Sequence, residues 1–303
     1  MRLHERAALG GVASMLAALL VASAAACSPG SGPGGLSVVV GFYPLQFVAE
    51  RVGGDQVRVA NLAQPGAEPH DLELSPRQVG QISDASLVVY VSGFQPAVDE
   101  AVGQSAVAAL DVASVVHLRD ATDLPADEGL GGRDPHVWLD PTLLATIASA
   151  VAARLEQLDP DGAAGYRDRA TALTGALSTV DQEYRDGLRQ CGRREIVVSH
   201  AAFGYLADRY GLRQIPITGL SPDTEPTPGQ LASAVDQARR AGATTIFVEP
   251  LVSADIARSV ADAAGARVAV LDPIEGLQGG SSADYVSVMR ANLDTLRTAL
   301  GCS

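Results

Sequence analysis

The sequence predicts an α/β protein made of two similar Rossmann-like lobes with parallel sheets, joined by one long connector helix. Two observations lead to this prediction. Short apolar segments alternate with helical segments in both halves of the chain, which is typical of parallel sheets covered by helices. Both halves also contain the motif Ser/Thr-Pro-x-Gln-Val/Leu, at residues 75–79 and 227–231, and each copy is followed by an apolar strand.

The first lobe is expected over residues 37–160. Ser75 and Pro76 predict a helix start, because serine caps helix N-termini and proline fits the first helical position. A further helix is predicted over residues 44–50, ending before Gly53 and Gly54. The apolar runs that predict its strands lie at residues 37–40, 57–60 and 86–91, with another strand expected near Val115.

A long helical stretch with Leu and Ala at helical spacing follows at residues 141–190, and Asp159-Pro160-Asp161-Gly162 breaks it in two. The second piece is the expected connector helix, residues 161–190. The second lobe is expected over residues 191–303. Its predicted strands lie at residues 195–199, 213–217, 244–248 and 267–271, and Pro216 indicates an edge position or an early end for the second of them.

The N-terminus has the layout of an export signal, expected over residues 1–26. Arg2 and Arg6 precede an uncharged, mostly apolar run that ends in Ala24-Ala25-Ala26-Cys27. This ending resembles a bacterial lipobox, with Ala24 where Leu is usual, and ordinary cleavage after an alanine is the alternative. Residues 27–36 are then a lipidated Cys27 and a flexible tether of Ser, Pro and Gly. We expect an exported chain, lipid-anchored to the outer face of the cytoplasmic membrane.

Two cysteines remain, Cys191 and Cys302. In an oxidising exported compartment they are expected to form a disulfide. A two-thiolate metal site is the weaker alternative, because no CxxC spacing is present.

The net charge of −13, from 22 basic and 35 acidic residues, argues against nucleic-acid binding. An acidic surface is compatible with a cationic ligand and equally with simple solubility.

Three histidines and one aspartate follow predicted strands at or soon after their carboxyl ends, two from each lobe: His70, His136, His200 and Asp272. Ligands of open parallel sheets bind at that edge, so the four side chains are expected to converge in the interdomain cleft. Three imidazoles and one carboxylate make a tetrahedral Zn²⁺ set. His117 is interpreted as a structural or surface residue.

Four segments of the sequence resemble, in order, motifs of the zinc and manganese solute-binding proteins of bacterial ABC transporters. They are Gly-Ala-Glu-Pro-His-Asp at 66–71, Asp-Pro-His-Val-Trp-Leu-Asp-Pro at 134–141, Val-Val-Ser-His-Ala-Ala-Phe-Gly-Tyr-Leu at 197–206, and residues 221–228. The resemblance implies two lobes joined by a long helix, a single metal in the cleft and a membrane permease as partner. It assigns the ligands to the same His70, His136, His200 and Asp272. A histidine rather than a glutamate at the third position favours Zn²⁺ over Mn²⁺.

The chain departs from the family pattern in two places. Residues 120–134 are acidic and contain no histidine, where many zinc members have a His-rich loop. Pro69 stands where some members place a glutamate ligand, so Glu68 is out of position for that role. Around the ligands we expect Asp71, Asp134, Trp138 and Glu225: the aspartates orienting imidazoles or capping helices, Trp138 packing the cleft wall, and Glu225 shaping a loop or the cleft.

The sequence therefore predicts a monomeric receptor that captures a divalent metal, Zn²⁺ first, and delivers it to an ABC importer. The alternatives are a Mn²⁺ or Fe²⁺ receptor of the same family and a zinc-dependent hydrolase. No HExxH or Gly-x-Ser-x-Gly motif is present, which argues against an enzyme.

Overall fold

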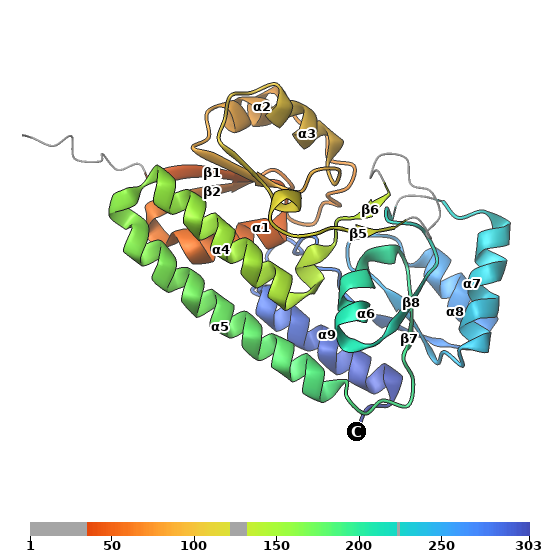
Figure 1. Ribbon diagram of the computed structural model, residues 1–303. Coiled ribbons are helices and arrows are strands. Elements are labelled where there is room, and N and C mark those ends of the chain that lie inside the picture. The colour runs from red at the N-terminus through yellow and green to blue at the C-terminus, as the bar shows by residue number, and fades with distance from the viewer. Residues whose placement is uncertain (1–34, 122–131, 223–224) are drawn as a thin grey trace, which may run out of the picture. The chain divides into compact units, whose positions relative to one another are not determined.

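Two four-stranded parallel sheets occupy the part of the chain that the computed structural model describes, residues 35–121, 132–222 and 225–303 (Figure 1). The predicted signal peptide, Cys27 and nearly all of the tether lie outside the described residues, as does most of the acidic loop at 120–134. Residues 34–303 form one compact unit. The predicted α/β class and the two parallel sheets are confirmed.

The first sheet has the strand order β2-β1-β3-β4. Its strands are β1 (Leu36–Val40), β2 (Val57–Asn61), β3 (Leu87–Tyr90) and β4 (Ala109–Asp111). Val40 pairs with Asn61 on one side and Val89 on the other, and all pairs are parallel. Val38, Val39 and Val40 are fully or almost fully buried, as expected for a central strand covered on both faces.

The second sheet has the order β10-β9-β7-β8. Its strands are β7 (Glu195–Val198), β8 (Arg213–Pro216), β9 (Thr245–Val248) and β10 (Arg267–Val270). β8 lies at an edge and ends at Pro216, as the proline predicted, since proline cannot donate to a ladder.

Helices flank both sheets (Figure 1). Their bounds are α1 (Tyr43–Gly53), α2 (Pro76–Ser83), α3 (Pro96–Gly103), α4 (Pro141–Leu158), α5 (Ala163–Gly187), α6 (Gly204–Tyr210), α7 (Pro228–Arg240), α8 (Asp255–Ala264) and α9 (Tyr285–Leu300). The repeated motif forms a capping box in both halves: Ser75 with Gln78 starts α2, and Thr227 with Gln230 starts α7.

The longest helix, α5, has 25 residues and leads from the N-terminal half (β1 to α4) to the C-terminal half (β7 to α9). It packs against α4, α1 and α9, and its buried side chains include Leu177, Val180 and Tyr184. One apolar core continues across both halves, where Phe47 of α1 stacks on Tyr285 of α9 with ring centroids 5.4 Å apart. The two halves are therefore packed together and not only tethered by the helix.

A short antiparallel pair precedes the predicted site and was not predicted. β5 (Arg119–Asp120) pairs with β6 (Arg133–Asp134), while the strand expected near Val115 is instead a 3-10 turn at Val112–Ser114. Two-residue strands carry no periodic pattern, so only their pairing defines them. Among the described residues, no helix combines the length and apolar character that crossing a membrane requires.

Cys191 and Cys302 form the predicted disulfide, 111 residues apart in sequence. The backbone around it is also paired: the Gly192 amide donates to the Gly301 carbonyl at 3.2 Å, and the Ser303 amide donates to the Gln190 carbonyl at 3.0 Å. The end of α9 is thus fastened to the segment that follows α5.

Replacing both cysteines, Cys191→Ser with Cys302→Ser, should lower the free energy of unfolding by about 2–4 kcal/mol, because the closed loop restricts the unfolded chain. Urea denaturation without reductant measures this change. The double variant should be insensitive to added reductant, whereas the wild type should lose similar stability on reduction. Equal stability of wild type and variant would contradict the expected contribution.

Candidate metal centre

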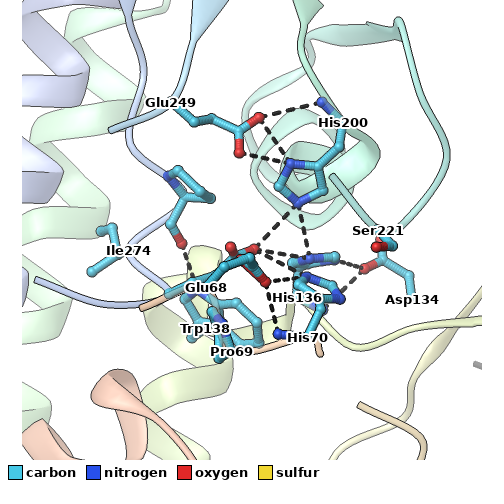
Figure 2. Close-up of polar contacts among 12 residues, drawn as sticks. Glu68, Pro69, His70, Asp134, His136, Trp138, His200, Ser221, Glu249 and Ile274 are labelled. Atoms are coloured by element: carbon cyan, nitrogen blue, oxygen red, sulfur yellow. Dashed lines mark hydrogen bonds and ion pairs between the residues drawn. The ribbon is translucent and has the colours of Figure 1, made fainter. Parts of the chain in front are cut away.

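Three imidazoles converge in the interior, those of His70, His136 and His200 (Figure 2). With the Glu275 carboxylate they each offer one atom, and all four atoms lie within 4.8 Å of one another. His70 is 5% exposed, Glu275 2%, and the other two are fully buried. Two of the side chains come from each half of the molecule. The interior position between the halves agrees with the cleft site that the sequence predicted.

Each of these side chains is placed by the chain segment that follows a strand. His70 lies in the loop after β2, His136 and His200 each lie two residues after the end of a strand (β6 and β7), and Glu275 lies in the loop after β10. The His136 amide donates to Asp134 Oδ1 at 3.0 Å and the His70 amide to Glu68 Oε1 at 2.7 Å, which fixes the backbone at both residues. His200 and Glu275 therefore lie at the carboxyl edge of the second parallel sheet, where open parallel sheets bind ligands, whereas His136 follows a strand of the antiparallel β5–β6 pair.

The separations within the cluster have the size of a tetrahedral coordination shell. Glu275 Oε1 lies 3.2 Å from His136 Nε2, 3.2 Å from His200 Nε2 and 3.5 Å from His70 Nε2. The Nε2 atoms of His136 and His200 are 3.4 Å apart. Ligands about 2.0–2.1 Å from a tetrahedral zinc ion are about 3.3–3.4 Å from one another. Four of the six ligand-to-ligand separations therefore match the shell of one small tetrahedral cation.

Two of the imidazoles are oriented by buried carboxylates. His136 Nδ1 lies 2.8 Å from Asp134 Oδ1, and His200 Nδ1 lies 2.8 Å from Glu249 Oε1 (Figure 2). A carboxylate accepts the Nδ1 proton, which leaves the Nε2 lone pair of each ring directed at the centre of the cluster.

His70 supplies a different observation. Its buried Nε2 has no hydrogen-bond partner in the described part of the chain, although it faces Glu275 Oε1. The ring packs edge-on against Phe94, with centroids 4.5 Å apart. An unsatisfied buried polar atom costs about 1–3 kcal/mol. A bound cation would satisfy this nitrogen, so the cluster fits a metal better than it fits an ion-free hydrogen-bond network.

Burial and the neighbouring charges shift the pKa values of these groups in opposite directions. Burial disfavours the charged form of His200, but the carboxylates of Glu249 and Glu275 outweigh it and hold the pKa well above its usual value. His136 behaves similarly: Asp134 and Glu275 overcome burial and raise its pKa. At His70 burial prevails and lowers the pKa. For Glu275, His200, His136 and His70 together outweigh burial and lower the pKa well below its usual value.

Asp272 does not join the cluster, which corrects the expected fourth ligand. Its Oδ1 accepts a hydrogen bond from the Ile274 amide at 2.7 Å, and Glu275 occupies the fourth position three residues later. Burial raises the pKa of Asp272 to about 6, partly offset by the Ile274 amide. The sequence showed a carboxylate at the end of β10. The turn after β10, which the sequence pattern does not reveal, decides which carboxylate enters the site.

The residues expected around the ligands divide into two groups. Asp134 orients His136, and Trp138 packs on the His136 ring with centroids 5.1 Å apart while its Nε1 donates to the Pro273 carbonyl at 2.7 Å. Asp71 and Glu225 are exposed, and so is His117.

Besides Glu275, Glu249 is a second residue of the site that the sequence did not assign to it. It directly follows β9, is 6% exposed and accepts the His200 Nδ1 proton. The rule that found the histidines also applies to it, because a polar residue at the carboxyl end of a parallel strand lies at the binding edge. Its position after the apolar run at 244–248 was the available signal.

Asp134 also connects the site to the C-terminal half. Its Oδ2 accepts from Arg119 Nη1 at 3.2 Å, and Arg119 Nε pairs with Asp208 of α6 at 2.8 Å. Tyr205 of α6 donates to the Asp134 carbonyl at 2.8 Å. Gly204 makes room for this contact, since a Cβ there would collide with the Arg119 guanidinium and reach 2.7 Å from Asp134 Oδ2.

Gly204→Ala should displace Arg119 from Asp134 and lower the free energy of unfolding by about 1–2 kcal/mol. Thermal or urea unfolding of the metal-free chain measures it. Gly175→Ala, at an exposed position of α5, is the matched control: a Cβ there meets nothing within 4 Å, so it should be neutral or stabilising. Similar effects of both substitutions would show that the close approach at Gly204 is unimportant.

Comparison with known proteins gives consistent matches. A family model described as ZnuA, zinc-uptake complex component A, periplasmic, matches residues 38–299. The high-affinity zinc uptake system protein ZnuA of Bacillus subtilis is 31% identical over 279 residues, which is 88% of this chain and 88% of that one. The zinc-binding lipoprotein AdcA of Streptococcus pneumoniae is 31% identical over 301 residues, covering 94% of this chain but only 60% of AdcA.

Among solved structures, the laminin-binding protein Lmb of Streptococcus agalactiae superposes with a TM-score of 0.80 at 34% identity, covering 88% of this chain and 100% of that one. Lmb is described as a bifunctional protein with adhesin and metal transporting activity. Sequence and structure therefore match the same group of proteins over almost the whole described chain.

Proposed function

Because the chain belongs to the family of periplasmic zinc-uptake components, we propose that it captures Zn²⁺ outside the cytoplasmic membrane and delivers it to an ABC importer. The observation that most supports this is the buried group of three imidazoles and one carboxylate at tetrahedral spacing. In this proposal His70, His136 and His200 bind the ion through Nε2, and Glu275 binds it through a carboxylate oxygen.

The donor set favours zinc over manganese. Imidazole nitrogens suit Zn²⁺, whereas Mn²⁺ prefers oxygen ligands and higher coordination numbers. With His200 in third place the set has three nitrogens and one oxygen. The small spacing within the cluster also suits a four-coordinate ion.

The same donor set supports a receptor rather than a hydrolase. A catalytic zinc ion keeps one position open for water, whereas four protein ligands complete a tetrahedral shell. The buried Glu275 takes the position that an attacking water would need. Zn²⁺ is therefore cargo here, bound in a closed shell and released when the shell opens.

Export and anchoring complete the proposal. Cys27 is proposed as the lipidated first residue of a monomeric receptor at the outer face of the membrane, with residues 28–36 as the tether. AdcA, a relative, is named a lipoprotein, which supports this assignment. The net charge of −13 would raise the local concentration of cations around the protein.

Competitive titration of the chelator-stripped chain with Zn²⁺ and Mn²⁺ tests the proposal. One Zn²⁺ per chain is expected, bound far more tightly than Mn²⁺ and raising the melting temperature by linkage. His200→Ala should abolish tight binding and Glu275→Gln should weaken it, while the exposed His117→Ala should have no effect. Preference for Mn²⁺ would overturn the metal assignment, and absence of tight binding would overturn the receptor proposal. Loss of binding in His117→Ala would overturn the ligand set.

Zinc affinity should fall as the pH falls, and the fall should begin above the ordinary histidine pKa of about 6.5. The reason is that the metal-free site raises the pKa of His136 and His200, so these rings hold protons that zinc must displace. His70, with a lowered pKa, adds no such proton near neutral pH. Calorimetry in buffers of different ionisation enthalpy measures the released protons. Zinc affinity unchanged between about pH 8 and pH 6 would contradict this mechanism.

A further inference from the structure

The residue before Glu275 has an unusual backbone conformation. Ile274 has a φ of 59° and is the one non-glycine residue with positive φ among the described residues. Its side chain is fully buried. A β-branched residue rarely adopts the left-handed region, and such strain persists only where the surroundings enforce it.

The surroundings that hold this turn are identifiable. Asp272 Oδ1 accepts from the Ile274 amide at 2.7 Å, so the carboxylate closes the turn across Pro273. Asn292 of α9 makes two hydrogen bonds to the Asp272 backbone. Asn292 Oδ1 accepts from the Asp272 amide at 2.9 Å, and Asn292 Nδ2 donates to the Asp272 carbonyl at 2.7 Å. Trp138, from the N-terminal half, donates to the Pro273 carbonyl.

These contacts determine where Glu275 points. The strained residue immediately precedes Glu275, whose carboxylate lies within 3.5 Å of all three Nε2 atoms. A relaxed Ile274 would turn the following residue in another direction, since φ changes by more than 90° between the left-handed and the ordinary regions. Holding a ligand in place before the metal arrives removes an ordering cost from binding.

We propose that Asp272 and Asn292 are positioning residues for metal capture, which hold the strained turn at Ile274 and thereby seat Glu275 in the metal site. The inference rests on the proposed function and adds to it two residues that act without touching the ion. It also gives Asp272 a role through its hydrogen bond to Ile274 in place of the ligand role expected from the sequence.

The turn also borders a cavity of about 180 Å³, whose lining includes Glu275, Gly276, Leu277, Gln278, Gln64 and Pro65. Glu275 therefore lies between the buried cluster and an open space. When the turn is released, this ligand has room to swing away from the ion. Loss of the hydrogen bonds that Asp272 and Asn292 make to this turn should consequently appear mainly as faster metal dissociation.

The test compares zinc affinity and chelator-induced zinc dissociation in the full chain carrying Asp272→Ala, Asp272→Asn or Asn292→Ala. Asp272→Ala and Asn292→Ala should weaken zinc binding by about 10–100-fold, the usual effect of removing a partner that orients a ligand. Asp272→Asn keeps an acceptor oxygen for the Ile274 amide and should stay within about threefold of wild type. Asp262→Ala, an exposed carboxylate on α8, is the control and should match wild type.

A double-mutant cycle separates positioning from general damage. In a Glu275→Gln background, Asp272→Ala should add less than about threefold, because it acts through a ligand already altered. The visible spectrum of bound Co²⁺ should change alike in Asp272→Ala and Glu275→Gln. The melting temperature of each metal-free variant shows that it is folded.

Equal large losses in Asp272→Ala and Asp272→Asn would make Asp272 a charged ligand and overturn the inference. It would also be overturned if Asp272→Ala bound zinc like wild type, or if its effect were undiminished beside Glu275→Gln. A wild-type chain that binds no zinc would overturn the proposed function itself. If the wild type binds zinc and both Asp272→Ala and Asn292→Ala bind it equally well, the inference alone is overturned.

Discussion

The contact between the Glu275 carboxylate and three buried imidazole nitrogens, at 3.2–3.5 Å, is the interaction on which the rest of the structure depends. Buried ionisable groups are stable only when they are paired and hydrogen-bonded. Each member of this cluster therefore needs a defined partner and a defined direction. The folds of the two halves, the core between them and the turn before Glu275 can all be understood as ways of meeting this requirement.

The surrounding partners show how the requirement is met. Asp134 and Glu249 take the Nδ1 protons of two rings, and both carboxylates are themselves buried. Asp134 is in turn paired with Arg119, which reaches Asp208 on α6 of the other half. The site is thus connected to the packing between the halves through charged hydrogen bonds. A cation in the cluster would reinforce the same contacts, because it holds ligands from both halves together.

The shared core limits how the site can open. Phe47 and Tyr285 stack across the two halves, and the Tyr285 hydroxyl donates to the Trp138 carbonyl at 2.6 Å, close to His136. Opening the halves as rigid bodies would separate these buried groups. The turn that carries Glu275 borders a cavity of about 180 Å³.

The sequence by itself determined the α/β class, most of the strands and helices of the two parallel sheets, the disulfide and the three histidines. The strands follow from β-branched runs, the helix starts from the Ser75 and Thr227 capping boxes, and the histidines from the rule that ligands follow strand ends. The disulfide follows from two remaining cysteines in an exported chain. Tertiary structure alone decided between Asp272 and Glu275, because the outcome depends on a strained Ile274 that Asn292 holds from 20 residues away in the chain. It also decided the pairing of β5 with β6 and the partnership of Glu249 with His200 across 49 residues. Such contacts join residues distant in sequence, and no local periodicity records them.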